Sequence, residues 1–198
     1  MTVTEVRFHG RGGQGVVTAA ELLAVAAFED GAYAQAFPSF GSERTGAPVA
    51  SFCRIADVPI RTREPVMEPD VLIVLDPTLL HQVDLFAGLR PDAYVLLNTV
   101  KSFDELGIGE FVSGLRHERL LTVPATEMAL RHVGRSVPGS VLLGGYAAMT
   151  GRVSLPAVVA ALRERFSGAV ADGNVAAAEE AFAFVGQERE ELRRAAPA

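Results

Sequence analysis

The feature that most constrains this chain is a glycine-rich turn between a predicted strand and a predicted helix. The turn fits the pattern G-x-G-x-x-G and consists of Gly10, Arg11, Gly12, Gly13, Gln14 and Gly15. Residues 4–9 alternate as in a strand, and residues 16–28 are rich in alanine and leucine, which is typical of a buried helix. Glycine permits a positive φ angle and lets a ligand or another backbone come close. A helix N-terminus offers free N–H groups and partial positive charge, so we expect this loop to suit a phosphate or carboxylate.

The remainder of the chain continues as an α/β pattern. A strand–loop–helix–strand opening predicts that the first two strands are parallel, with a right-handed crossover. We expect one domain over residues 1–198, a three-layer α/β/α fold with a mostly parallel, Rossmann-like sheet. The predicted strands cover residues 4–9, 33–37, 49–55, 71–75, 93–97 and 120–123. The predicted helices cover residues 16–28, 78–89, 125–133, 140–149, 155–166 and 174–194, with Ser154 and Asn174 as caps of the last two, and residues 57–69 form a turn and an edge piece.

Composition excludes several classes of protein and site. Cys53 is the only cysteine, so the chain can form no internal disulfide and cannot supply the roughly four thiolates of an iron–sulfur cluster. In its alternating segment, Cys53 is expected to be a small buried side chain rather than a nucleophile. The formal charge of −6 argues against a nucleic-acid partner. With no apolar run of about 18 residues and no secretory pattern at the N-terminus, we expect no membrane segment and a cytoplasmic location.

A dinucleotide-binding domain is one alternative for the glycine loop. That reading requires an acidic residue at the end of the second strand to bind the ribose. The strand over residues 33–37 ends without one, since Glu29 and Asp30 come too early and Glu43 too late. A stand-alone nucleotide-binding or regulatory module is therefore disfavoured but open, as is a tight turn that binds nothing.

A second unusual loop follows the second strand, over residues 38–48. It combines glycine with hydroxyl groups and an adjacent Glu–Arg pair, and its candidate binding residues are Ser39, Ser42, Glu43, Arg44 and Thr45. Loops after the carboxyl ends of parallel strands form the ligand crevice of such sheets. We therefore expect the second loop and the glycine loop to be neighbours.

Three other features have plainer interpretations. Asp76 follows the apolar run 71–75, which is typical of a strand buried on both faces, and we expect it to serve as a turn or cap before Pro77. Gly144 and Gly145 belong to a face of small residues suited to close helix packing. The histidines do not cluster at metal-ligand spacing, so no metal site is predicted.

Both loops together carry a family resemblance. Residues 12–15 (GGQG) followed by residues 38–49 (PSFGSERTGAPV) resemble the gamma subunits of pyruvate and 2-ketoacid:ferredoxin oxidoreductases. The likeness continues through residues 69–76, residues 141–145 and Asn174, and so spans nearly the whole chain. The related indolepyruvate oxidoreductase beta subunit shares the first loop, whereas the second loop favours the pyruvate branch. One departure is Val137-Pro138-Gly139-Ser140, where family members often have an asparagine before the helix.

The resemblance implies a subunit without catalytic residues of its own. Such enzymes decarboxylate a 2-oxoacid on thiamine diphosphate with Mg, pass electrons to [4Fe-4S] clusters and transfer the acyl group to coenzyme A. The resemblance places these cofactors on alpha, beta and ferredoxin-like delta partner subunits, which pass electrons to ferredoxin or to an NAD-linked acceptor. The gamma domain packs against that core and helps shape coenzyme A access. We therefore expect both loops to face the thiamine-bearing subunits and the coenzyme A channel, with Arg11 and Arg44 as anion or interface contacts and Gln14 as a polar contact.

Overall fold

The computed structural model describes residues 3–39 and 45–195. Its centre is a six-stranded sheet with the order β2-β3-β1-β4-β5-β6. The strands are β1 (Val3–Arg11), β2 (Tyr33–Pro38), β3 (Pro48–Ala56), β4 (Val71–Val74), β5 (Tyr94–Asn98) and β6 (Leu120–Val123). β3 is antiparallel to both of its neighbours, and the pairs from β1 through β4 and β5 to β6 are parallel. The prediction of a mostly parallel sheet is confirmed.

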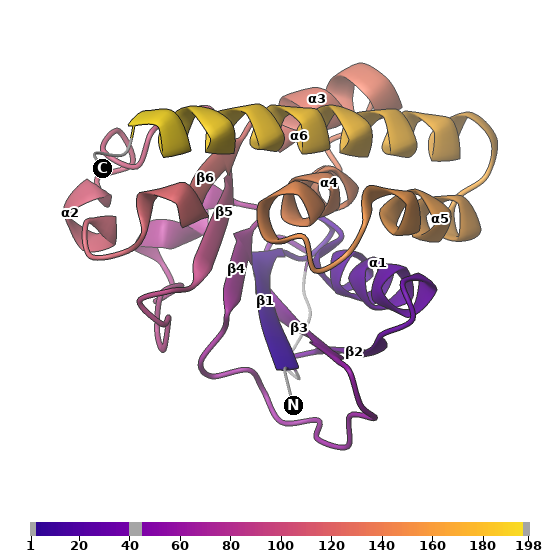
Figure 1. Ribbon diagram of the computed structural model, residues 1–198. Coiled ribbons are helices and arrows are strands. Elements are labelled where there is room, and N and C mark those ends of the chain that lie inside the picture. Colours follow the sequence, from indigo (N-terminus) through magenta and orange to yellow (C-terminus); the bar gives the residue numbers. More distant parts are fainter. Residues whose placement is uncertain (1–2, 40–44, 196–198) are drawn as a thin grey trace.

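The first two strands run in the same direction, as predicted, because each is antiparallel to β3. They are not neighbours in the sheet, however, because β3 lies between them. This arrangement brings the end of β1, the end of β2 and the start of β3 to one edge of the sheet (Figure 1).

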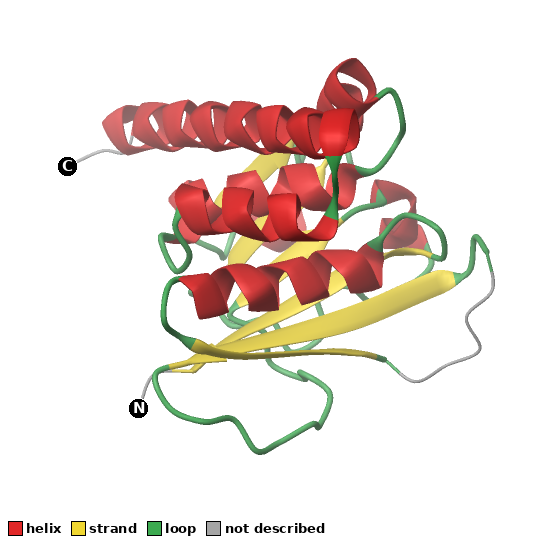
Figure 2. Cartoon of the chain, turned by 90° about the vertical axis from the view of Figure 1, so that its right-hand side faces the viewer, coloured by secondary structure: helices red, strands yellow, loops and turns green. Residues whose placement is uncertain are grey.

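Helices cover the two faces of the sheet unequally. Figure 2 shows the long helices stacked on one face; they are α1 (Val16–Glu29), α3 (Ala125–Val133), α4 (Pro138–Thr150), α5 (Leu155–Arg165) and α6 (Gly168–Ala195). The other face packs against short helices and loops, among them the 3-10 helix η1 (Pro77–His81) and α2 (Gly109–Val112). A second 3-10 helix, η2 (His117–Arg119), leads into β6 and contacts α6. The predicted three-layer fold is confirmed, with a second helical layer reduced to short turns.

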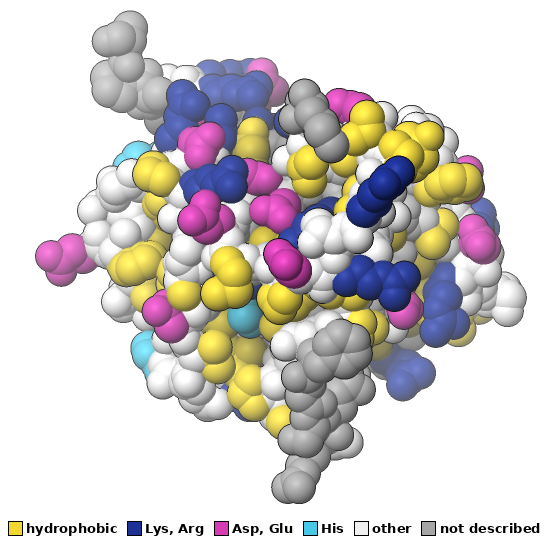
Figure 3. All heavy atoms as spheres, turned by 90° about the horizontal axis from the view of Figure 1, so that it is seen from below, with side chains coloured by type: hydrophobic (Ala, Val, Ile, Leu, Met, Phe, Trp, Pro, Cys, Tyr) yellow, Lys and Arg dark blue, Asp and Glu magenta, His cyan; other side chains and the backbone are white. Residues whose placement is uncertain are grey.

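Each face of the sheet has its own hydrophobic cluster, and β4 contributes side chains to both. Val71 and Ile73 pack with the long helices, whereas Leu72 and Val74 pack with the short-helix layer. All four side chains are almost completely buried, which confirms the prediction of a strand covered on both faces. On the surface, Figure 3 shows positive and negative side chains interspersed with apolar ones on the face seen from below. No helix in the described part of the chain is long and apolar enough to cross a membrane.

The predicted helix over residues 78–89 is wrong. Only η1 forms there, and the chain then continues in turns. A distant buried cation binds this segment instead: the Arg7 guanidinium donates hydrogen bonds to the carbonyls of Leu85 (2.9 Å) and Ala87 (2.7 Å), and a helix over residues 78–89 would have used the Leu85 carbonyl internally. The same guanidinium reaches the carbonyls of Val66 and Met67, so it ties residues 57–69, where no strand forms, to the segment after η1.

The predicted cap at Asn174 is also wrong. Helix α6 begins at Gly168, and Asn174 lies inside it with 2% of its surface exposed. Its side chain accepts a hydrogen bond from the Ser140 hydroxyl and donates to the carbonyl of Val170. A buried polar partner on another helix, rather than an exposed N-terminus, explains this asparagine. By contrast, Ser154 caps α5 as predicted, accepting from the N–H of Ala157.

Candidate functional site

The glycine loop and the second loop lie side by side, as predicted. The register pairs Arg11 with Pro48, at the edge where β1 ends and β3 begins. Beyond that pair, the N–H of Gly12 donates to the carbonyl of Ala47 (2.9 Å), and the N–H of Gly46 donates to the carbonyl of Gly12 (3.1 Å). Thr45 forms an isolated bridge with Gly12. The two loops that were predicted to be neighbours are therefore in direct backbone contact.

Of the other predicted binding residues in the second loop, the structure describes only Ser39. Ser39 is exposed, and its N–H donates to the carbonyl of Ala50 (2.9 Å). Ser42, Glu43 and Arg44 lie outside the described residues, so the proposed contacts of these three side chains remain predictions.

Two conformational demands explain the glycines of the first loop. Gly13 and Gly15 have φ angles of 93° and 80°, a region that side chains with a Cβ atom rarely adopt. Gly15 is also the residue before the first turn of α1. Gly10 has an ordinary φ angle, but a Cβ atom there would lie 2.6 Å from Cγ2 of Val16. The chain can turn this tightly from β1 into α1 only because these positions are glycine.

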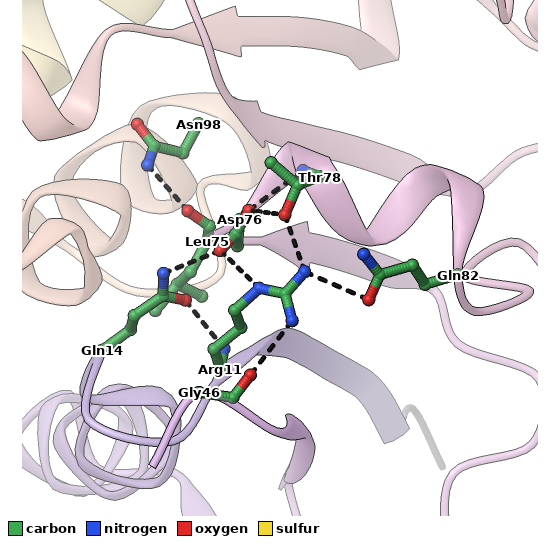
Figure 4. Close-up of polar contacts among 8 residues, drawn as sticks. All are labelled: Arg11, Gln14, Gly46, Leu75, Asp76, Thr78, Gln82 and Asn98. Atoms are coloured by element: carbon green, nitrogen blue, oxygen red, sulfur yellow. Dashed lines mark hydrogen bonds and ion pairs between the residues drawn. The ribbon is translucent and has the colours of Figure 1, made fainter.

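A carboxylate from the next parallel strand braces the glycine loop. Asp76 follows β4, and its Oδ2 accepts hydrogen bonds from Nε of Arg11 (3.0 Å) and Nε2 of Gln14 (2.8 Å; Figure 4). Its Oδ1 accepts from the N–H of Thr78 (2.9 Å) and the Thr78 hydroxyl (2.6 Å). The cap before Pro77 that the sequence predicts is thus confirmed, and the same carboxylate also ties the glycine loop to the end of β4.

The Arg11 guanidinium is occupied within the protein. Besides Asp76, it donates to the carbonyl of Gly46 (3.0 Å), to the Thr78 hydroxyl (2.9 Å) and to Oε1 of Gln82 (3.1 Å). Every nitrogen of the group therefore has a partner. The geometry makes Arg11 a connection between the glycine loop, the second loop and η1, and its charge is offset by Asp76.

The same brace determines the ionisation of Asp76. Burial by itself would raise the pKa of this carboxyl, but hydrogen bonds from Thr78 and Gln14 and the positive charge of Arg11 outweigh it. The net effect holds the pKa of Asp76 below its ordinary value. The carboxylate is therefore charged at neutral pH, which the hydrogen bonds from Arg11 and Gln14 require.

Asn98 extends the polar connections to the next strand and was not singled out by the sequence. It ends β5, and its Nδ2 donates to the carbonyl of Leu75 (2.7 Å; Figure 4). The same Nδ2 donates to the Thr126 hydroxyl (2.8 Å). Its Oδ1 accepts from the N–H of Thr126 (3.0 Å) in the first turn of α3. A polar residue directly after an apolar strand was the available signal, since such residues meet at the carboxyl edge of a parallel sheet.

Two hollows flank the first turn of α1. One, of about 340 Å³, is lined by Gly12, Val16, Val17, Thr18 and Val49 together with Arg11. The other, of about 200 Å³, is mostly apolar and is lined among others by Gly13, Leu22, Arg135, Val137, Phe166 and Asn174. Both hollows lie at a helix end whose N–H groups have no partner within the helix. The arrangement can accept an anionic group next to an apolar one.

Other titratable groups of the described chain do not form a reactive cluster. Burial, helped by the charge of Arg7, lowers the pKa of His9 to about 4, so this imidazole is neutral at physiological pH. Burial raises the pKa of the Cys53 thiol, which agrees with the predicted role as a small core residue. Among the described residues, no three His, Cys, Asp or Glu side chains are grouped as metal ligands.

A family model, curated sequences and a solved structure that resemble this chain all belong to pyruvate oxidoreductases. Residues 5–184 match the family model described as pyruvate ferredoxin/flavodoxin oxidoreductase. The chain is 49% identical to the pyruvate synthase subunit PorC of Methanothermobacter marburgensis. It is 50% identical to the common subunit gamma of the pyruvate/ketoisovalerate oxidoreductases of Thermococcus kodakarensis. Each match covers 90% of this chain and 95% of the relative. The crystal structure of pyruvate oxidoreductase subunit PORC from Thermotoga maritima superposes with a TM-score of 0.79 at 37% identity, over 92% of this chain and 97% of that one.

Proposed function

The chain belongs to the pyruvate ferredoxin/flavodoxin oxidoreductase family, and on that premise we propose that it is the gamma subunit of a 2-oxoacid:ferredoxin oxidoreductase that acts on pyruvate. The observation that carries the proposal is the near-complete match to gamma subunits: relatives of almost the same length share about half of their residues with it. The reaction is the oxidative decarboxylation of the 2-oxoacid to an acyl-CoA.

We assign the catalytic cofactors to partner subunits. Thiamine diphosphate, with Mg, supplies the decarboxylation chemistry when bound, and [4Fe-4S] clusters receive the electrons. The residues of this chain do not fit a cluster, because its single cysteine is buried in the core. The assembly would contain alpha, beta and ferredoxin-like delta subunits in the cytoplasm and would pass electrons to ferredoxin or an NAD-linked acceptor.

The part we assign to this chain is to shape the coenzyme A site. The glycine loop and the second loop share one wall at the carboxyl edge of the sheet, and the first turn of α1 opens beside them. Backbone N–H groups at such a turn bind phosphate, and the adjoining apolar hollow suits a less polar part of the same ligand. These features support residues 10–15 together with Ser39, Ser42, Glu43, Arg44 and Thr45 as the loops that face coenzyme A.

The assembly is tested by purifying the tagged chain from its native host. We expect thiamine-binding and iron–sulfur subunits to copurify, with coenzyme A-dependent oxidation of pyruvate exceeding that of other 2-oxoacids in a substrate panel. Recovery of the chain alone, with affinity for a dinucleotide, would instead support the nucleotide-binding module and overturn the proposal.

The role of the loops is tested with a matched pair of glycine substitutions in the assembled enzyme. Gly13 and Gly31 both have positive φ angles, and a Cβ atom at either would meet nothing within 4 Å, so Gly13→Ala and Gly31→Ala carry a similar backbone strain. Only Gly13 lies in the glycine loop; Gly31 follows the far end of α1. We expect Gly13→Ala to raise the KM for coenzyme A several-fold relative to Gly31→Ala. Equal values in the two variants would remove the glycine loop from the site.

Arg44→Ala is the corresponding test of the second loop. Its matched control is Arg61→Ala, which removes an exposed arginine from residues 57–69. We expect Arg44→Ala to weaken coenzyme A binding or assembly while Arg61→Ala leaves both unchanged. Normal coenzyme A affinity and normal assembly in Arg44→Ala would exclude Arg44 from both roles.

A further inference from the structure

Asp76 holds together segments that lie far apart in the sequence. Its carboxylate joins the glycine loop, through Arg11 and Gln14, to the end of β4 and to η1. Arg11 continues the connection to the second loop through the carbonyl of Gly46. Removing this one carboxylate would release Arg11 and Gln14, the two glycine-loop side chains that it holds.

Apart from the backbone hydrogen bonds that join Gly12 to Gly46 and Ala47, the glycine loop has few restraints on its shape. Within the loop, the backbone bond from the N–H of Gln14 to the carbonyl of Arg11 (3.0 Å) closes a single turn. Gly13 and Gly15 have no side chains to limit their motion, and glycine has the greatest conformational freedom of any residue. The Gln14 side chain compensates for this: its Oε1 accepts from the N–H of Arg11 (2.7 Å), and its Nε2 donates to Asp76. The orientation of the loop therefore depends on whether the carboxylate holds Gln14 and Arg11.

We propose that Asp76 is a positioning residue for coenzyme A: its carboxylate fixes Arg11 and Gln14 so that the glycine loop directs its backbone N–H groups, and not the Arg11 guanidinium, toward the ligand's phosphate. The proposal rests on the proposed function of the loop. Arg11 supports it, because a guanidinium with every nitrogen already bonded within the protein is arranged to hold a loop and not to bind a ligand.

Asp70 provides a matched control at the opposite end of the same strand. Its Oδ2 accepts from the N–H of Glu5 (2.8 Å), and its Oδ1 accepts from Nη1 of Arg90 (3.1 Å), so it also joins a backbone amide and an arginine to β4. Asp70→Asn and Asp76→Asn therefore perturb comparable interactions, but only Asp76 contacts the glycine loop. A general loss of stability would affect both variants.

The experiment compares steady-state kinetics of the assembled enzyme carrying Asp76→Asn or Asp70→Asn. We expect Asp76→Asn to raise the KM for coenzyme A at least about fivefold, because a displaced loop weakens ligand contacts. We expect the KM for the 2-oxoacid and the kcat at saturating coenzyme A to stay within about twofold of the unmodified enzyme. Asp76→Glu, which keeps the charge, should restore part of the affinity.

Two further outcomes are informative. If Asp76→Asn prevents assembly, Gln14→Leu removes the Gln14 half of the brace while keeping the Asp76 cap and the Arg11–Asp76 ion pair, and it should raise the same KM. An unchanged KM in both variants, a fall in kcat alone, or an equal effect of Asp70→Asn would overturn the positioning role. The proposed function fails separately: in that case Gly13→Ala also leaves the KM for coenzyme A unchanged, whereas a response to Gly13→Ala without a response to Asp76→Asn rejects only the role of Asp76.

Discussion

The close contact between α4 and α6 offers a quantitative test of the packing. Gly144 of α4 lies against the backbone of α6, and a Cβ atom at this position would be 1.9 Å from the carbonyl oxygen of Ala178 and 2.9 Å from its Cα atom. Ordinary contacts of this kind begin near 3.4 Å. The obstacle is backbone inside a long helix and not the end of a flexible side chain. Gly144→Ala therefore forces α4 and α6 apart by on the order of 1 Å.

Two opposing effects determine the size of the change. Alanine favours the helix over glycine by about 1 kcal/mol. Overpacking a close-packed interior costs about 1–3 kcal/mol, and more where backbone must move. We therefore expect Gly144→Ala to lower the free energy of unfolding by about 2 kcal/mol, which corresponds to a fall of about 4–8 °C in Tm for a chain of this length.

Two neighbouring glycines serve as controls in the same urea-unfolding experiment, followed by circular dichroism. A Cβ atom at Gly145 would meet only the side-chain ends of Leu96 (3.2 Å) and Val185 (3.3 Å), so Gly145→Ala should remain within about 1 kcal/mol of the unmodified chain. A Cβ atom at Gly186 would meet nothing within 4 Å, so Gly186→Ala should stabilise α6 by about 0.5–1 kcal/mol. If Gly144→Ala proved as stable as Gly186→Ala, the close approach of α4 to α6 would be refuted.

Three further predictions concern buried polar groups. Arg7→Met removes the donor shared by four backbone carbonyls, those of Val66, Met67, Leu85 and Ala87, and should lower the free energy of unfolding in urea by about 2–4 kcal/mol. It should also make residues 57–69 and 82–89 more sensitive to limited proteolysis, and a cleavage pattern equal to that of the unmodified chain would contradict this prediction. Because burial raises the pKa of Cys53, the folded chain should react with a thiol reagent only on the timescale of unfolding, and rapid labelling under native conditions would show that the thiol is accessible. The pKa of Asp76 is lower in the folded chain, so its contribution to stability is fully present above the unfolded pKa of about 3.9 and is lost as the pH falls through the folded pKa. Asp76→Asn should therefore flatten the acid side of the curve of stability against pH. An unchanged acid slope would mean that the carboxylate is not stabilised in the folded state.

The sequence predicts most of the fold because the strands are marked by local patterns. The apolar run of β4 and the alternation in β1 are visible without any tertiary information, and both strands form within two residues of the predicted bounds. The position of β3 between β1 and β2 was not predicted, because the pairing of strands depends on loops whose path no local pattern specifies.

The two incorrect predictions share a physical cause. Residues 78–89 have a helix-like pattern, but the buried guanidinium of Arg7, 78 positions before Leu85 in the chain, competes for the Leu85 carbonyl. Asn174 has the preference of a cap, but the hydroxyl of Ser140 on α4 satisfies it inside a longer helix. In both cases a polar group distant in sequence outweighs a local propensity, because an unpaired buried polar group costs more free energy than a propensity supplies.

At the candidate site, too, local sequence patterns predict some contacts and miss those that depend on residues distant in the chain. Neighbouring loops are expected because both follow the carboxyl ends of strands that run in the same direction, and the structure has them in contact. The partner of Arg11 does not follow, because Asp76 lies 65 positions away and the prediction could weigh only the charge of the arginine itself. Once that charge is offset by Asp76, the phosphate binding that we propose would have to come from the backbone N–H groups of the loop and from the first turn of α1. On that proposal the N–H groups are effective only in one orientation, so the glycine loop depends on the carboxylate that holds it.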